Sequence, residues 1–468
     1  MSRHAARMFL GMLSIGAILA RPSPLFAQDQ STTVRELAQA LADEEARISA
    51  LKTELDQATA ALEDLSRRLR EIAPTPLQPT TPQPPLVFVP ATPPPVPTAA
   101  EIPRFGFYGD AKVRYETLQQ DFPGCIGCPN RKRGRLRLRF GAEGRLAPDF
   151  KAVMGFGTGD LNDPNTVYVN LGNNFSRKVA SWDRGYVEYH PTKASWMDLT
   201  AGKFPYTWIR SSMTWDVDFY PEGLSERFSF DLKNTGVLKN VGVQGFQLIV
   251  NEQPIDQHMT VVGTQLTART QVSNRLTTGF AVTGVNIQQP DLMLHALLDG
   301  SDIGVKNTNQ IVINNGVASY ASGFRFVNAI VDNGIRTRWP AWPVAAAFEY
   351  QHNLRAASDR DTAWSVRFDA GRAQQRGDWD VSWHFFRVEQ DANLAGFGES
   401  DWRAPTNVIQ QRFGVDRMLN ANVQLSFTLY RGRTLDRLLP GALFPTGLPA
   451  GLNDPWTNRM YFDVTYRY

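Results

Sequence analysis

From residue 104 to the end, the chain alternates between apolar and polar positions with a period of two. In residues 105–116, Phe, Phe, Gly, Ala, Val and Tyr occupy one face, and the other face carries Tyr108, Asp110, Lys112, Arg114 and Glu116. The pattern recurs at 135–142, 246–250, 344–350, 364–370 and 423–429, in segments bounded by Gly, Asn, Asp or Pro. Because successive side chains of a strand point to opposite faces, the pattern predicts many strands with one apolar face and one polar, often charged, face.

Two all-β architectures are compatible with this alternation, a soluble sandwich and a closed transmembrane barrel. The segment is large for a single sandwich and contains no convincing amphipathic helix. The final residues are apolar at every second position up to the terminal Tyr468, and other aromatics fall at predicted strand ends: Tyr108, Trp182, Tyr189, Trp339, Trp342, Trp379 and Trp383. Such girdles are typical of outer-membrane barrels. The sequence therefore predicts an all-β transmembrane fold, an antiparallel outer-membrane β-barrel.

The first residues have the order of a secretory signal peptide. Arg3 and Arg7 precede an apolar run over residues 8–20, and Pro and small residues then lead to Ala27. The run is shorter than the ~20 residues that a membrane-spanning helix needs. We predict a signal peptide over residues 1–27 and export from the cytoplasm, with an N-terminal membrane anchor as the alternative.

Residues 34–72 carry a heptad repeat that predicts an α-helical coiled coil. Apolar residues fill all but one of its a and d positions, which are Val34, Leu37, Leu41, Glu44, Ile48, Leu51, Leu55, Ala58, Leu62, Leu65, Leu69 and Ile72. This seam implies a homo-oligomer but does not separate two strands from three. The alternative is one amphipathic helix packed on a globular domain. Prolines then make up 12 residues of segment 74–103, which predicts a semi-rigid extended linker.

Basic residues concentrate on one predicted strand. One face holds five arginines, and the other is apolar: Arg131, Arg133, Arg135, Arg137 and Arg139 against Leu136, Leu138 and Phe140. Arginine on the lipid face would cost about 2–4 kcal/mol at the bilayer midplane, so the arginines must face the lumen or lie above the membrane. The candidate pore-lining residues are Arg135, Arg137, Arg139, Lys112, Arg114, Asp216 and Asp218, with the two aspartates as an acidic counterweight across a constriction.

The charge balance leaves two interpretations of this stripe open. Residues 104–468 contain 31 Arg and 9 Lys against 35 Asp and Glu, a surplus of five positive charges. Unpaired guanidinium groups along a pore would attract anions. Alternatively, the arginines pair with carboxylates on neighbouring strands or loops. Segments 158–176 and 299–316, rich in Gly, Asn and Asp, are candidate loops that narrow the channel.

Motifs for catalysis or ligand chemistry are missing from the sequence. Cys125 and Cys128 are followed by Pro129 and a basic strand, which favours a loop disulfide or two free thiols over a redox helix. No further ligands near them suggest a metal site. The histidines after residue 27 are scattered and lie in no catalytic motif. We therefore predict a protein that is not an enzyme, binds no cofactor and recognises no nucleic acid.

Several blocks resemble one family of outer-membrane proteins. Residues 135–145, 153–160 and 182–189 resemble early strands of the putative porin family of proteobacteria, and residues 199–205, 214–218 and 221–224 match it most closely. The resemblance covers most of 104–468 and is strongest over 135–225. It implies a channel of about sixteen strands that assembles as a trimer, with an N-terminal coiled coil before the barrel and no catalytic residues. It supplies no substrate.

These observations predict a porin for passive diffusion of small hydrophilic solutes or ions, in contact with outer-membrane lipid. An even-stranded barrel leaves both termini in the periplasm. The predicted parts are then a signal peptide (1–27), a coiled-coil oligomerisation segment (28–73), a periplasmic linker (74–103) and the barrel (104–468). The coil could stabilise a trimer or reach peptidoglycan. The rival interpretation is a structural tether or an adhesin.

Overall fold

The computed structural model describes residue 49 and residues 105–119, 130–233, 236–252, 258–298, 307–436 and 456–468. The predicted signal peptide, the linker, Cys125 and Cys128 lie outside the described residues. So does the predicted coiled coil apart from Ser49, which is helical, and the coil therefore stays a prediction. The unit from Val96 to Tyr468 is described here by itself.

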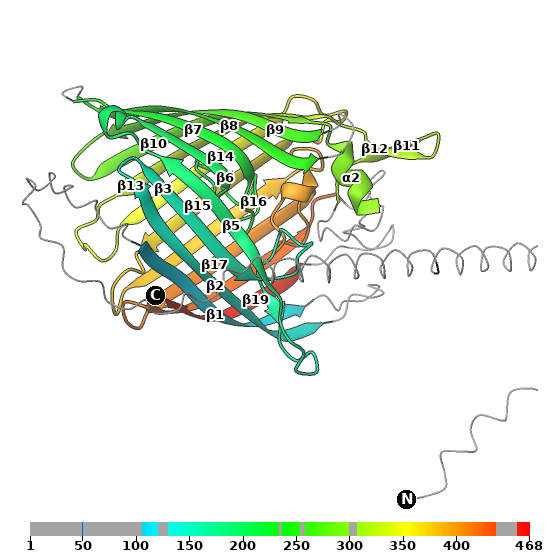
Figure 1. The fold of residues 1–468 in the computed structure, drawn as a ribbon, viewed down its shortest axis with the longest axis horizontal. Coiled ribbons are helices and arrows are strands. Elements are labelled where there is room, and N and C mark those ends of the chain that lie inside the picture. Colours follow the sequence, from blue (N-terminus) through cyan, green and yellow to red (C-terminus); the bar gives the residue numbers. More distant parts are fainter. Residues whose placement is uncertain are drawn as a thin grey trace, which may run out of the picture. The chain divides into compact units, whose positions relative to one another are not determined.

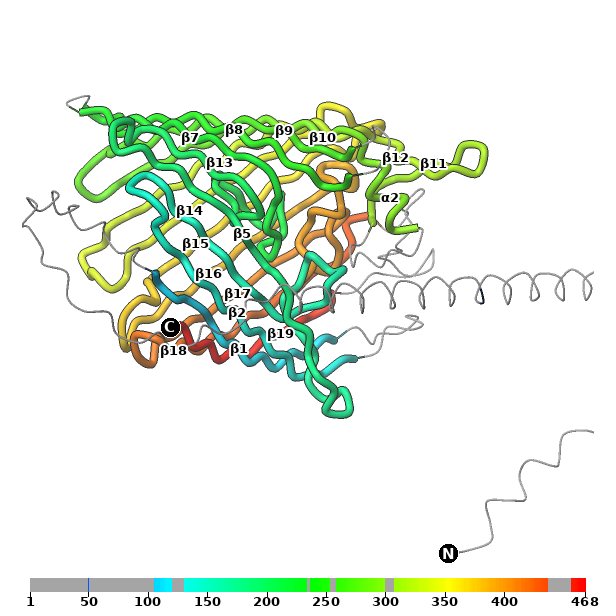
Figure 2. The backbone as a smooth tube through the Cα atoms, in the orientation of Figure 1, coloured from blue at the N-terminus to red at the C-terminus, as the bar shows by residue number. Residues whose placement is uncertain are grey.

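Sixteen long antiparallel strands form a closed barrel. The alternating pattern predicted the barrel, and the family resemblance implied about sixteen strands. They are β1 (Phe105–Gln119), β2 (Arg131–Ala147), β3 (Phe150–Thr158), β5 (Ala180–Tyr189), β6 (Met197–Lys203), β7 (Glu222–Asp231), β8 (Leu238–Glu252), β9 (His258–Gln271), β10 (Leu276–Gln288), β13 (Phe324–Ile335), β14 (Val344–Asn353), β15 (Thr362–Gly371), β16 (Trp379–Val388), β17 (Val408–Met418), β18 (Val423–Thr434) and β19 (Thr457–Arg467). A two-residue strand, β4 (Val169–Asn170), adds to the edge of β2. Each long strand pairs with its neighbours, and the strands run obliquely around the barrel (Figures 1 and 2).

The first and last strands close the barrel. β1 pairs with β2 on one side and with β19 on the other, in a register that places Val113 opposite Val464. At the end of this seam, the backbone N–H of Gly109 donates to the Tyr468 carbonyl at 3.1 Å, and the Tyr468 N–H donates back at 3.2 Å. The terminal aromatic residue is therefore part of the closed sheet.

The two ends of the barrel differ in their connections. Short turns join the strands at one end, at residues 148–149, 190–196, 232–237, 272–275, 336–343, 372–378 and 419–422. The other end carries long connections, among them residues 204–221, 289–323 and 389–407. Outer-membrane barrels place short turns in the periplasm and long loops outside. By this rule β1 begins and β19 ends on the periplasmic side.

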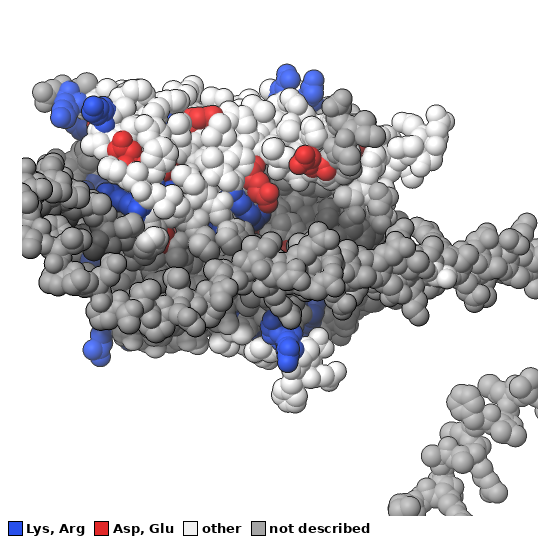
Figure 3. All heavy atoms as spheres, viewed as in Figure 1, with Lys and Arg blue, Asp and Glu red and all other residues white. Residues whose placement is uncertain are grey.

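The outer face of the barrel is apolar. Val113, Leu138, Phe280, Phe368 and Phe462 are among many large hydrophobic side chains that are exposed on it. In Figure 3 most of the described surface in view is uncharged, and its acidic and basic side chains form a few separate groups. Aromatic residues predicted at strand ends, including Trp182, Trp339, Trp342 and Trp379, are also exposed. An apolar band with aromatics at its ends is the surface that a bilayer requires.

One connection contains secondary structure that the alternation did not predict. Residues 289–323 hold a helix, α2 (Asp291–Leu298), and a hairpin of β11 (Ile311–Asn314) and β12 (Val317–Tyr320), at the loop end of the barrel (Figure 1). Leu294 and Met293 of the helix are buried, and the Asp291 carboxylate accepts the Tyr320 backbone N–H at 2.7 Å. Within the described residues, no helix is long and apolar enough to span a membrane.

Candidate functional site

Two of the long connections fold into the barrel. We name residues 204–221, between β6 and β7, lumen loop A, and residues 389–407, between β16 and β17, lumen loop B. Phe204, Met213 and Asp216 of loop A and Leu394 and Thr406 of loop B have no exposed surface. Neither loop is among the candidate segments predicted from the sequence, although both segments bond to lumen loop B. The Ser400 hydroxyl donates to the Asn165 carbonyl at 3.0 Å, and the Asn309 amide donates to the Gln390 carbonyl at 2.7 Å.

Side chains of the barrel wall hold lumen loop A. The Gln265 side chain of β9 accepts the Ile209 backbone N–H at 2.9 Å and donates to the Ile209 carbonyl at 2.8 Å. The Ser211 hydroxyl donates to Glu349 of β14, and Glu349 is fixed by an amide N–H of Asn328 at 2.8 Å. Side chains of β9 and β14, two strands far apart in the sequence, thus bond to the same short stretch of lumen loop A.

The two lumen loops also bond to each other. The Asn393 side chain of loop B donates to the Thr214 carbonyl at 2.7 Å, and the Asp216 backbone N–H donates to the Phe397 carbonyl at 2.8 Å. In return the Asp216 carboxylate accepts the Ser400 backbone N–H at 2.8 Å. The loops therefore form one connected structure across the barrel.

An apolar cluster anchors this structure to one side of the inner wall. It combines residues of β8, β9, β10 and β13 with residues of both loops: Phe246, Leu248, Val261, Val285, Ile287, Phe326, Phe204, Trp208, Trp215, Leu394 and Phe397. Trp208 stacks on Phe246 with ring centroids 4.0 Å apart, and Trp215 stacks on Phe397 at 4.7 Å. The alternation at 246–250 thus marks an inner face, because the loops give apolar side chains a partner inside the barrel.

The opposite part of the inner wall is charged. We call the inward side chains of β19, β1 and β2 the charged wall. Arg114 of β1 makes two bonds to the Asp463 carboxylate of β19, at 2.8 and 3.0 Å. Arg137 donates to Asp110 at 2.8 Å, and Arg135 lies 3.4 Å from the Glu116 carboxylate. The predicted stripe therefore faces inward.

Most arginines of the stripe lie against carboxylates, which is the geometry of the second interpretation given above. Glu116, fully buried, also accepts from Arg133 at 2.8 Å and from Arg459 at 3.1 Å. Lys112 lies 3.7 Å from Asp463. The Tyr168 ring covers part of the stripe, with the Arg135 guanidinium 4.9 Å from its centroid. Most stripe cations within the described residues are thus bound to acids rather than free.

Acidic residues of the lumen loops reach this wall. Asp218 lies 3.5 Å from Arg139, and Asp401 lies 3.7 Å from Arg114 and 3.4 Å from Arg459. The structure thus brings Asp218 to the arginines, as the sequence suggested. Asp216 instead turns toward loop B and forms no ion pair with the stripe in the described part of the chain.

The carboxylates of the lumen loops fall into two groups, one with a raised pKa and one with a lowered pKa. Burial and the nearby Asp218 raise the pKa of Asp216 to about 8, and burial beside Asp216 raises the pKa of Glu399 well above its usual range. Asp401 is half-buried, and Arg459 and Arg114 outweigh the effect of burial and lower its pKa to about 2. At neutral pH, Asp216 and Glu399 therefore favour the uncharged form and Asp401 is ionised.

These features define a class of protein. A closed barrel of sixteen strands with an apolar outside, a charged inner wall and inward-folded loops is the architecture of an outer-membrane porin. The family model described as putative porin matches residues 123–322 and 319–438, and the chain belongs to this family. This confirms the family that residues 135–224 suggested.

Solved porins are similar to the chain over most of its length. OmpF of Salmonella typhi, in a complex with daunomycin, is 11% identical and has a TM-score of 0.43, covering 78% of this chain and 97% of its own. OprB of Pseudomonas putida is 9% identical with a TM-score of 0.49, covering 78% and 94%. A Rhodopseudomonas blastica porin mutant is 8% identical with a TM-score of 0.39, covering 78% and 100%. No curated protein matches the chain.

Family membership places the protein in the outer membrane of a Gram-negative bacterium, as a channel for passive diffusion. Family and fold both point to a channel that is not an enzyme.

Proposed function

We propose that the barrel is a water-filled channel for small hydrophilic solutes and ions, narrowed by lumen loops A and B. The observation that carries this proposal is the inner wall. Buried arginines and carboxylates line a barrel whose outer face is apolar, and a channel for polar solutes requires this arrangement.

The charge of the wall supports a modest preference for anions. Among the described residues, the ion pairs on this side of the lumen join eight basic and six acidic side chains: Lys112, Arg114, Arg133, Arg135, Arg137, Arg139, Arg184 and Arg459 with Asp110, Glu116, Asp183, Asp218, Asp401 and Asp463. This surplus of two positive charges is small, so the field that selects ions is weaker than an unpaired stripe would produce.

The oligomeric state is part of the same proposal. The heptad repeat of residues 34–72 and the resemblance to trimeric channels support a homotrimer with its coil in the periplasm. The coil would be long enough to reach toward peptidoglycan. A structural barrel is the second candidate, because the apolar cluster and two loops fill part of the lumen. In that case the protein would serve as a tether or an adhesin.

Single-channel currents test the proposal. The full mature protein, purified from outer membranes, is placed in a planar bilayer and then exposed to a salt gradient. Conductance steps in groups of three, with a small reversal potential on the anion side, would support the proposed trimeric porin. Cation selectivity would refute the anion preference alone. A folded, heat-modifiable barrel without conductance would refute the channel and favour the structural role.

Coil orientation is tested separately in a variant that carries Cys125→Ser and Cys128→Ser, by labelling a single cysteine placed in residues 34–72 with a membrane-impermeant reagent on intact cells. We expect no labelling until the outer membrane is permeabilised. Labelling of intact cells would favour the adhesin.

A further inference from the structure

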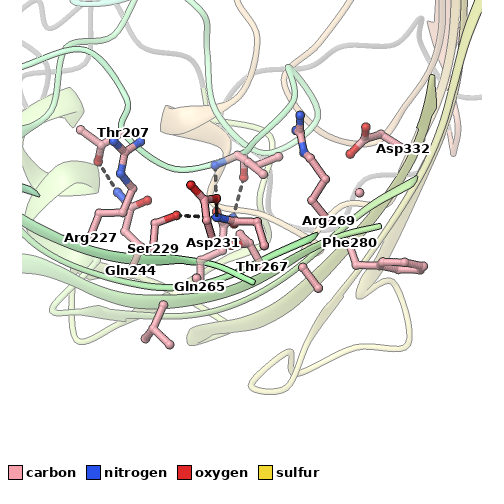
Figure 4. Close-up of a pocket in the computed structure, with 16 residues that line it drawn as sticks. Thr207, Arg227, Ser229, Asp231, Gln244, Gln265, Thr267, Arg269, Phe280 and Asp332 are labelled. Carbon is pink, nitrogen blue, oxygen red and sulfur yellow. Dashed lines mark hydrogen bonds between the residues drawn. The ribbon is translucent and has the colours of Figure 1, made fainter. Parts of the chain in front are cut away.

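A polar pocket of about 360 Å³ lies on the inner wall, between lumen loop A and the short turns. It is lined by inward side chains of β7, β8, β9 and β13, by Gly279 of β10, and by Thr207 and Ile209 of loop A. Figure 4 shows the side chains of Arg269, from β9, and Asp332, from β13, at nearby positions on the barrel wall. Its size is that of a small-molecule site.

Two of the four charged side chains that line the pocket are already bound to protein partners. Arg227 donates to the Asp198 carboxylate at 2.9 Å, and Asp231 accepts an amide N–H of Asn240 at 2.8 Å. Gln265 is bonded to loop A and to Thr283. These groups shape the pocket and are not free to change partners without cost.

Arg269 and Asp332 differ from these groups. Among the described residues, neither side chain has a hydrogen-bond or ion-pair partner, although both line the same pocket. They are not an ion pair with each other, since no nitrogen of Arg269 lies within 4.0 Å of an Asp332 oxygen. One unpaired cation and one unpaired anion thus face the same space.

Gly279 makes room between the two charges. The register places Gly279 of β10 opposite Arg269 on one side and opposite Asp332 on the other. The two charged residues therefore stand two strands apart, about 9.6 Å at the backbone. A Cβ atom at position 279 would collide with the Asp332 carboxylate, so that carboxylate leans over the glycine toward Arg269. A larger residue here would close the gap.

We propose that this pocket is a subsite for zwitterionic solutes, in which Arg269 binds a carboxylate and Asp332 binds an ammonium group. The planar guanidinium presents parallel N–H donors that match a carboxylate, and a carboxylate accepts from an ammonium group. Neutral donors and acceptors of Thr207, Ser229 and Asn240 border the space and suit a solute that is polar along its length. An amino acid is the simplest solute of this class.

The inference rests on the proposed channel function, because a solute reaches the pocket through the lumen. Arg269 and Asp332 lie in the halves of β9 and β13 nearest the short turns, on the opposite side of Gln265 from the long connections. A zwitterion would therefore meet this subsite after passing lumen loop A from outside. The site would raise the local concentration of such solutes without selecting for net charge.

The test uses the full protein in a planar bilayer, with serine as the zwitterion and glycerol as an uncharged comparison. A solute that resides in the lumen reduces ion current, so the half-maximal concentration for reduction reports its binding. We expect serine to reduce the current at lower concentration than glycerol. Arg269→Gln and Asp332→Asn should each weaken the serine effect about two- to fivefold and leave the glycerol effect unchanged.

Two further variants make the result specific. Arg269→Asp combined with Asp332→Arg should restore the serine effect, because a zwitterion can bind in the reverse orientation. Arg275→Gln is the matched control: it removes the same charge from the β9–β10 turn, outside the pocket, and should change nothing.

Normal ionic conductance with equal effects of serine and glycerol would overturn the subsite while leaving the channel intact. If Arg275→Gln and Arg269→Gln weaken the serine effect equally, the subsite is also overturned, because the effect would then come from overall charge. Absence of any conductance would overturn the channel and the subsite together.

Discussion

Replacing Gln265 by alanine should loosen lumen loop A. The Gln265 side chain makes two hydrogen bonds to the backbone of Ile209, and it is fully buried. Each such bond contributes about 0.5–1.5 kcal/mol net, so the variant should favour the detached loop by about 1–3 kcal/mol. That corresponds to a shift of about five- to 150-fold in the equilibrium between attached and detached loop.

The effect is measured in single-channel recordings. A loop that detaches and returns should produce flicker between conductance levels, with a higher mean conductance than the parent protein. Gln247→Ala is the matched control, because Gln247 bonds at 3.3 Å to Glu226 of the wall and does not reach loop A. Identical conductance distributions for Gln265→Ala and Gln247→Ala would show that Gln265 does not hold the loop.

Three other perturbations follow from the structure. Asp463→Asn removes the carboxylate that binds Arg114 twice and leaves this buried cation only Asp401, 3.7 Å away, so it should lower the free energy of unfolding by about 3–5 kcal/mol, measured by urea unfolding in detergent. Raising the pH from 6 to 10 ionises Asp216, whose pKa is about 8, so the added negative charge should move the reversal potential toward cations, and Asp216→Asn should lessen that movement. Leu138→Arg puts a charge on the lipid face and should cost about 2–4 kcal/mol near the midplane, measured by heat-modifiability of the assembled barrel.

Each of these has a result that contradicts it. Unchanged unfolding of Asp463→Asn would mean that the Arg114 pair is replaced by another contact. A reversal potential that moves equally in Asp216→Asn would assign the titration to other groups. If Leu138→Arg assembles as well as Leu138→Ala, residue 138 lies outside the hydrocarbon layer of the membrane.

The barrel could be predicted from the sequence because its cause is local. A period of two fixes which side chains face lipid, and one slip in register would expose every charge, so the pattern at 105–116 and 135–142 determines strand and face together. The direction of the arginine stripe follows from the same argument. Whether the stripe was paired could not be decided, because a period of two does not record which acids reach it. Arg139, for example, pairs with Asp183 of a later strand and with Asp218 of lumen loop A.

The lumen loops could not be predicted for a related reason. Their anchors join distant residues, such as Ser211 with Glu349 and Ser400 with Asp216, and no periodic pattern records such pairs. A usable signal was nevertheless present, because Trp208, Trp215 and Phe397 are large aromatics in connections that would otherwise be polar. Large apolar side chains in a loop need a partner, and the partner here is the inside of the barrel.

The seam between β1 and β19 has a consequence for the order of biogenesis. Arg114 and Asp463 are 349 positions apart, and Tyr468 bonds to Gly109, so the sheet cannot close before β19 has been exported. Until then β1 and the growing end of the sheet both present unpaired edges, which invite aggregation. We therefore expect the chain to need escort through the periplasm until β19 pairs with β1. Deletion of residues 457–467 should leave the barrel open.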